Sequence, residues 1–226
     1  MRSSTANETT PTFPSLGTDL YLLNTDDSVT GPLQSLVLDH LLLNDGTTYW
    51  VDAAGHARTD TLARLAPSTR LLDRIQVARG FTAYQHAAII NRTADVITSE
   101  TALVVAPAID AMYRDDDSHG VEADRLLRDA FSTLTSRCRS SNVPLVVTCH
   151  RRDTLTAPIA RQVDETIQCE ATGFGPRFVG EGFETLVYPL GDGTAQTTLA
   201  FWKHVLEQRA AVTSTDQQEV MICGSN

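Results

Sequence analysis

Short apolar runs alternate with longer segments of helical periodicity along most of the chain. Apolar runs bounded by polar or turn-forming residues predict strands at 20–24, 48–53, 74–79, 102–106, 143–149, 165–170 and 183–190. Helical spacing predicts helices at 32–43, 59–65, 83–92, 121–140 and within 194–211. This alternation predicts an α/β fold, a doubly wound domain whose mostly parallel sheet carries helices on both faces and ends in a C-terminal antiparallel edge.

One domain accounts for most of the length. We expect it to span residues 16–211, between a disordered N-terminal tail (1–15) and a flexible C-terminal tail (212–226), because both ends are polar. No apolar run approaches the roughly 20 residues of a membrane span, and residues 1–12 lack the apolar core of a signal peptide. The sequence therefore predicts a cytoplasmic protein that does not contact a membrane.

The charged residues are unusual in kind. The chain has 17 Arg and a single Lys, 19 Asp and 9 Glu, and a net charge of −10. Few lysines and many aspartates are typical of proteins from salt-accumulating haloarchaea, although a GC-rich genome also favours arginine codons. A negative surface argues against a protein that coats nucleic acid. The four cysteines include no CxxC pair, so we expect neither a zinc site nor a disulfide framework.

Three segments, taken in order, resemble the ATPase core of the RecA-like recombinases, especially the archaeal recombinase and its paralogues. They are YWVDAAG at 49–55, RIQVARGF at 74–81 and LVVTCH at 145–150. The family has YIDTEG, VARAF and VVVTNQ at comparable spacing. The resemblance extends from about Leu20 to about Leu190, and it implies a single RecA-like domain with a role in DNA recombination or repair.

The phosphate-binding loop of that family is degenerate here. The equivalent loop is residues 26–34, in which Gly31 remains but Pro32 and Leu33 stand where the family has Lys and Ser or Thr. The lysine of such a loop reaches the β- and γ-phosphates and the hydroxyl binds Mg²⁺, and proline also removes a backbone N–H. Gly31 is therefore the one cofactor-binding candidate, and no bound cofactor is expected.

The other catalytic positions of the family are also replaced. The water-activating Glu falls on Ala54, and the Mg²⁺-side Asp falls on Ala106 or Pro107, with Asp110 three or four residues later. Phosphoryl transfer depends on positioning and charge stabilisation by such groups. The resemblance thus implies a RecA fold without catalytic residues, and the alternative is a doubly wound domain that never had the site.

A basic loop follows the strand at 143–149. Arg151, Arg152 and Arg161 fall where the family has its second DNA-binding loop, and they are candidates for phosphate contacts. The alternative is a solvated loop whose arginines pair with Asp153 and Asp164. The family's first DNA-binding loop falls on residues 113–120, where three consecutive aspartates would repel a phosphate backbone.

Two further sites have competing interpretations. Phe174, Arg177 and Phe178 form either a partner-docking loop or a hairpin connection whose phenylalanines belong to the core. Cys149 and His150 suggest a thiolate with an adjacent base, but neighbours at a strand end point to opposite sides. Asp52 and His56 are too few ligands for a metal site, and Asp52 is better explained as the cap of a turn.

The sequence therefore predicts a non-catalytic RecA-fold paralogue. It would regulate or scaffold DNA recombination or repair through protein–protein contacts, with a RecA-family recombinase as the expected partner. The alternatives are a DNA-binding accessory module that uses Arg151, Arg152 and Arg161, and an atypical nucleotide-binding protein or an enzyme with new chemistry near Cys149 and His150.

Overall fold

The computed structural model describes residues 13–25, 31–53, 55, 59–114, 120–172, 175–185, 200, 202–211 and 213. In this part of the chain eight strands form one sheet in the order β3-β2-β4-β5-β1-β6-β7-β8. Their bounds are β1 (Leu20–Thr25), β2 (Thr47–Ala53), β3 (Ile75–Gly80), β4 (Thr101–Ala106), β5 (Leu145–Val147), β6 (Glu165–Thr172), β7 (Gly175–Gly180) and β8 (Phe183–Glu184). Strands β1 to β6 pair in parallel and β7 and β8 antiparallel, which confirms the predicted fold class.

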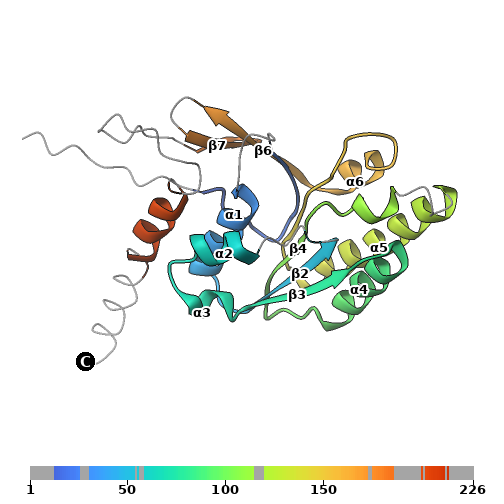
Figure 1. The fold of residues 1–226 in the computed structure, drawn as a ribbon, viewed down its shortest axis with the longest axis horizontal. Coiled ribbons are helices and arrows are strands. Elements are labelled where there is room, and N and C mark those ends of the chain that lie inside the picture. The colour runs from blue at the N-terminus through green and yellow to red at the C-terminus, as the bar shows by residue number, and fades with distance from the viewer. Residues whose placement is uncertain are drawn as a thin grey trace, which may run out of the picture.

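Helices cover both faces of the sheet (Figure 1). One face carries α1 (Pro32–Leu43), α2 (Thr59–Leu65), α3 (Thr69–Leu72) and the helical residues 202–211; the other carries α4 (Ala83–Val96), α5 (Gly120–Ser141) and α6 (Ala157–Gln162). Successive residues of β1 point to opposite faces of the sheet. Tyr21 and Leu23 belong to the hydrophobic core beside α1, and Leu20 and Leu22 belong to the core beside α5. Strands buried on both faces explain the continuous apolar runs in the sequence.

The long helix α5 has the amphipathic pattern that the sequence predicts. Its inward residues include Leu127, Ala130, Phe131 and Leu134, all of which are buried. These positions are three and four residues apart, so they form one stripe along the helix. Among the described helices, none is long and apolar enough to cross a membrane.

Elements from the two ends of the described chain pack together on the α1 face. Phe13 and Trp202 have ring centroids 5.1 Å apart, and Phe178 lies 5.9 Å from Phe13 and 5.3 Å from Trp202. Arg209 forms an ion pair with the buried Asp39 on α1. Since Phe13 is a core residue, the packed domain includes residues of the segment that was expected to be a disordered tail.

The path of the chain creates a switch point at the carboxyl ends of the central strands. After β1 the chain turns to α1 on one face, whereas after β4 and β5 it turns to α5 and α6 on the other. In open α/β sheets ligands bind where neighbouring strands send the chain in opposite directions. The carboxyl ends of β1, β4 and β5 therefore define the place to look for a site.

Candidate functional site at the carboxyl end of the sheet

The start of α1 differs from a phosphate-binding helix terminus. Gly31 caps the helix with a φ of +88°, a conformation that glycine adopts without strain. Its carbonyl accepts hydrogen bonds from the backbone N–H and the hydroxyl of Ser35 at 2.9 and 2.8 Å. Pro32 follows without an N–H, and the side chain of Leu33 is buried in the α1 core instead of offering a hydroxyl. Residues 26–30 of the loop lie outside the described part of the chain.

At the end of β2, Asp52 has a structural role. Its carboxylate is fully buried and accepts hydrogen bonds from the Gly55 N–H at 3.1 Å and from Arg79 Nε at 2.5 Å. These contacts agree with the interpretation of Asp52 as a turn cap. Position 54 and His56, the second member of the weighed metal pair, lie outside the described residues, and within those residues no cluster of three or more metal-ligating side chains occurs.

His86 lies on α4, and its backbone packs closely against Gly80 at the end of β3. It is fully buried, its Nδ1 lies 3.1 Å from the Tyr113 hydroxyl, and its Nε2 has no hydrogen-bond partner among the described residues. Burial lowers the pKa of His86 to about 4, so the ring is neutral at physiological pH. A Cβ at Gly80 would come within 2.8 Å of the His86 backbone, which explains glycine at the end of this strand.

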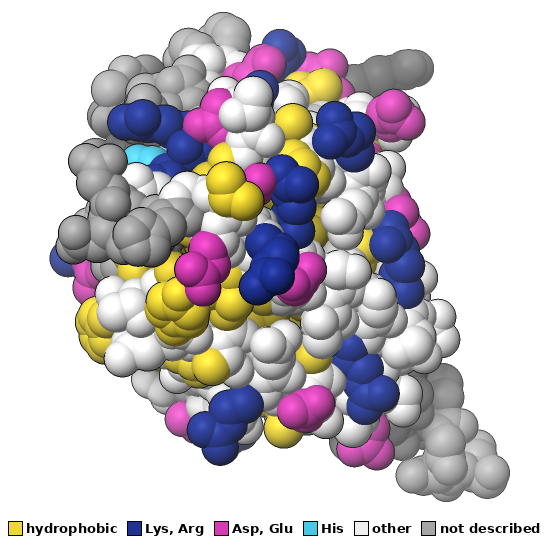
Figure 2. Space-filling view, turned by 90° about the vertical axis from the view of Figure 1, so that its right-hand side faces the viewer, with side chains coloured by type: hydrophobic (Ala, Val, Ile, Leu, Met, Phe, Trp, Pro, Cys, Tyr) yellow, Lys and Arg dark blue, Asp and Glu magenta, His cyan; other side chains and the backbone are white. Residues whose placement is uncertain are grey.

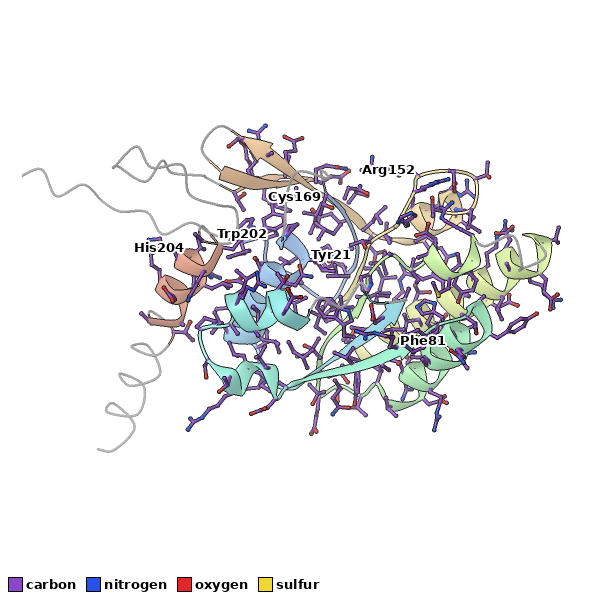
Figure 3. All side chains as sticks on the ribbon, in the orientation of Figure 1. Tyr21, Phe81, Arg152, Cys169, Trp202 and His204 are labelled. Atoms are coloured by element: carbon purple, nitrogen blue, oxygen red, sulfur yellow. The ribbon has the colours of Figure 1, made fainter. Side chains whose placement is uncertain are left out.

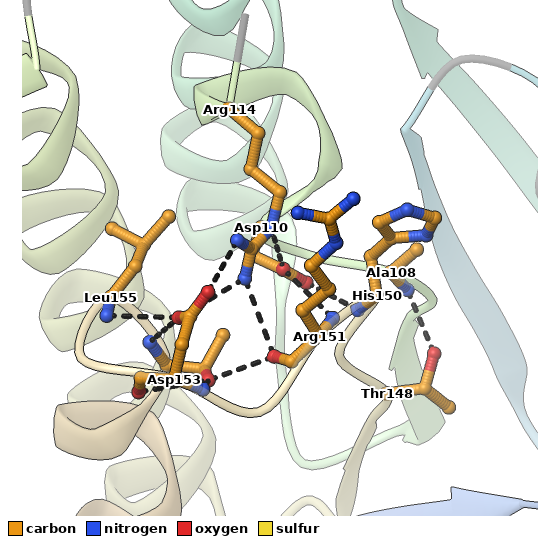
Figure 4. A network of polar contacts seen from close by, with 9 residues as sticks. Ala108, Asp110, Arg114, Thr148, His150, Arg151, Asp153 and Leu155 are labelled. Carbon is orange, nitrogen blue, oxygen red and sulfur yellow. Dashed lines mark hydrogen bonds and ion pairs between the residues drawn. The ribbon is translucent and has the colours of Figure 1, made fainter.

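Asp110 ties the loop after β4 to the loop after β5 (Figure 4). Its buried carboxylate accepts the His150 N–H at 2.6 Å and the Arg151 N–H at 3.3 Å, and it pairs with Arg114. Arg114 also donates to Asp153 at 2.6 Å, and hydrogen bonding from this guanidinium lowers the pKa of Asp153. Both carboxylate oxygens of Asp110 are thus engaged, so this residue holds the two loops together.

The three candidate DNA-binding arginines lie beside this network. The Arg151 side chain points away from Asp153, on the side of His150 (Figure 4). Arg152 donates to the side-chain oxygen of Gln168 at 3.3 Å, and Arg161 is exposed on α6. Within the described part of the chain, Arg151 and Arg161 make no side-chain hydrogen bond or ion pair.

If the loop after β5 were only a solvated loop, Arg151, Arg152 and Arg161 would be expected to pair with Asp153 and Asp164. Both carboxylates are instead occupied by arginines from elsewhere in the chain, Asp153 by Arg114 and Asp164 by Arg139 at 2.7 Å. The proposed pairings are therefore not formed, because the fold brings more distant arginines to the same carboxylates.

Cys149 does not have the properties of a nucleophile. Burial raises the pKa of its thiol to about 12, with the nearby Asp110 carboxylate adding to the effect. A reactive cysteine needs a stable thiolate near neutral pH. The structure therefore gives no support to chemistry centred on Cys149 and His150.

Of the three candidate docking residues, Phe178 lies in the core and Arg177 lies near the surface. Phe178 is fully buried in the aromatic cluster with Phe13 and Trp202, so it follows the core alternative and is not an exposed anchor. Arg177 pairs with Glu184 at 2.6 Å and with Glu170 at 3.2 Å across the β6–β7–β8 edge. Phe174 lies outside the described residues.

Exposed aromatic side chains occur at a place that the sequence analysis did not select. Figure 2, viewed from the side of α4, α5 and α6, shows hydrophobic side chains between basic and acidic ones. Phe81 lies directly after β3 (Figure 3) and is 69% exposed. Tyr84, on the first turn of α4, is 62% exposed. Gln85 holds this turn by accepting the Phe81 N–H at 3.1 Å while its own N–H donates to Thr82. In the sequence Phe81 is part of the segment that carries the family resemblance, and nothing in its spacing indicates that its ring is exposed.

The comparisons with known proteins agree with the fold. No family model matches the chain. The chain is 21% identical over 119 residues to the DNA repair and recombination protein RadB of Methanocaldococcus jannaschii, an alignment that covers 50% of this chain and 56% of that protein. The chain thus matches about half the length of this curated relative. This similarity, together with the mostly parallel sheet, supports the resemblance to the RecA-like superfamily.

Proposed function

We propose that this protein is a non-catalytic RecA-like domain that acts in DNA recombination or repair by binding a RecA-family recombinase. The similarity to RadB, a DNA repair and recombination protein, supports a role in recombination or repair. The partner is proposed because RecA-like cores assemble through their edges, so a related domain without catalytic groups is suited to cap or template such an assembly.

The residues at the sheet's carboxyl end support the absence of ATP hydrolysis. Pro32 and Leu33 supply neither the lysine nor the hydroxyl of a phosphate-binding loop, and Lys203 is far away in the sequence. Asp52 and Asp110 are buried and bonded to arginines and backbone amides. These contacts give both carboxylates a structural role, which supports the proposal that neither holds Mg²⁺ nor activates water.

The observation that carries the partner proposal is the open edge at β3. This strand pairs with β2 along one side, and within the described residues its other side has no partner strand. Residues 76–79 are exposed, Val77 among them, and the exposed rings of Phe81 and Tyr84 follow at the strand's end. An extended segment of a partner can pair with such an edge and place an apolar side chain against the two rings.

A direct binding measurement tests this function. The purified chain is titrated with a purified RecA-family recombinase from the same organism, in molar and in low KCl because the chain is acidic. We expect binding that weakens in Phe81→Ala and is unchanged in Leu43→Ala, a matched apolar truncation 52% exposed at the end of α1. Absence of binding, or ATP hydrolysis by the wild-type chain, would overturn the proposal.

DNA binding remains the second candidate function, because Arg151 and Arg161 carry no ion pair within the described part of the chain. Phosphate contacts release counterions, so affinity for DNA would fall with salt. Replacing Arg151, Arg152 and Arg161 by alanine should make the slope of log K against log salt less steep, by the equivalent of up to roughly three phosphate contacts. An unchanged salt slope in this variant would exclude these arginines as the DNA-binding surface.

A further inference from the structure

A groove of about 560 Å³ lies at the end of α1, on the face of the sheet that carries the helical residues 202–211. Its lining comes from the last residues of α1 and the loop after them, from Pro67 and α3, and from Ala210, Ala211 and Thr213. Small-molecule sites measure roughly 300–1,000 Å³, so a space of this size admits more than one side chain. Thr213 is the last residue that the structure describes, and the described part of the chain therefore ends in the lining of this groove.

Most polar side chains around the groove are already bonded within the chain. Arg74 donates to three backbone carbonyls at the end of α1 and in the loop that follows, those of Leu41, Asn44 and Gly46. The Asn44 side-chain nitrogen donates to a carbonyl of α1 at 2.9 Å, and the Thr213 hydroxyl donates to a carbonyl of its own helix at 3.0 Å. These contacts leave the apolar side chains as the main binding surface of the groove.

The apolar part of the lining is open to the outside. Leu43 is 52% exposed, whereas Leu38 and Leu41 earlier in α1 are buried. Leu42 and Pro67, which also line the groove, are only partly buried. Exposed apolar side chains that gather at a groove mark a surface that another apolar group covers.

The sequence supplies an apolar run a short distance after Thr213. Residues 214–219 are polar (STDQQE), residues 220–223 are apolar (VMIC), and residues 214–226 lie outside the described part of the chain. Four consecutive apolar residues in a polar stretch call for a surface that covers them. Seven residues separate Thr213 from Val220, a reach of roughly 23 Å when extended, and Ser, Thr and Asp at 214–216 favour a turn of the chain. The run is therefore within reach of the groove.

We propose that residues 220–223 of the same chain occupy this groove. The tether to Thr213 gives the run an effective concentration in the millimolar range, so that a weak apolar contact is enough to fill the groove. Arg70 lines the groove and forms no side-chain hydrogen bond or ion pair within the described residues, and its charge is opposite to that of Glu219, which precedes the run. Asp45 also lines the groove, so apolar burial contributes more to the contact than charge does.

Cys223 makes the occupancy of the groove measurable in the full chain. Its alkylation by iodoacetamide is followed by mass spectrometry, which distinguishes it from the buried Cys138 and Cys169 and from Cys149. A synthetic peptide of residues 212–226 gives the rate for a thiol that nothing covers. We expect Cys223 to react about tenfold more slowly in the chain than in the peptide, as burial of one or two apolar side chains implies. The protection should not depend on protein concentration, because the contact lies within one chain.

Two variants remove the contact from opposite sides. Leu43→Ala in the groove and Ile222→Ser in the run should each bring the Cys223 rate threefold to tenfold closer to that of the matching peptide. The control Val96→Ala, a truncation at a 50% exposed position on α4, and the control Gln218→Ser should leave the rate unchanged. Urea titration verifies that Leu43→Ala keeps its fold.

The proposal is overturned if Cys223 reacts equally fast in the chain and in the peptide, or if neither Leu43→Ala nor Ile222→Ser changes its rate. Protection that rises with protein concentration would also overturn it, because the occupant would then be the run of a second copy. No recombinase takes part in these measurements, so this proposal and the proposed function fail separately.

Discussion

Truncation of Phe81 is the perturbation that most specifically addresses the β3 edge. A phenylalanine side chain offers about 150–250 Å² of surface, and 69% of it is exposed at this position, so a partner that covers the ring would bury about 140 Å². At about 25 cal/mol per Å², that area corresponds to an upper bound of ~3.5 kcal/mol. Ordering the partner reduces this gain, so Phe81→Ala should weaken recombinase binding by about tenfold to a hundredfold.

The assay compares Phe81→Ala, Leu43→Ala and the wild type by calorimetry against the same recombinase. Because the Phe81 ring is mostly exposed, its removal should change the free energy of unfolding by less than about 0.5 kcal/mol, which urea titration verifies. Equal affinities for the three proteins, or equal losses in the two variants, would refute the assignment of binding to this edge.

Three further predictions concern the interior and the phosphate-binding position. Asp110→Asn should reduce the free energy of unfolding by about 2–4 kcal/mol in urea titrations, because it breaks the buried pair with Arg114, and a loss below 0.5 kcal/mol would contradict the role of the network. His86 has a pKa of about 4 when folded, below that of an exposed histidine, so its contribution to stability is complete above pH 6.5 and is lost as the pH falls toward 4. This loss of stability is on the order of 3 kcal/mol. Urea titrations at pH 7 and 4.5 measure it, and the His86→Leu variant should not show it because leucine does not titrate. MgATP should not be hydrolysed above the rate of a protein-free blank, and hydrolysis that responds to substitution of Gly31 would contradict the account of the α1 terminus.

The sequence pattern predicts the long elements well because their physics is local. The buried residues of α5, such as Leu127 and Phe131, recur at helical spacing, and strands buried on both faces appear as apolar runs. The helices α3 and α6 contain four and six residues, too few for a periodic pattern to show. The sequence of β7 favours a docking loop or a hairpin connection, because it contains glycine and proline and its one large apolar side chain, Phe178, gives no periodic signal.

The site was harder to predict because it depends on long-range contacts. The sequence places Asp153 beside Arg151 and Arg152, but the fold brings Arg114 from 39 residues away to that carboxylate. Similarly, Phe81 has the polarity of a core residue, and it is exposed because β3 is the last strand of the sheet. Neither fact can be derived from spacing along the chain.

Hydrogen exchange of the β3 amides, with and without a RecA-family recombinase, tests the central claim most directly. If an extended segment of the partner pairs with the open edge, the amides of residues 76–80 should exchange more slowly in the mixture, and Phe81→Ala should remove this protection. Protection that appears elsewhere, or unchanged exchange of β3 in a mixture shown to form a complex, would contradict the claim that this edge is the partner surface.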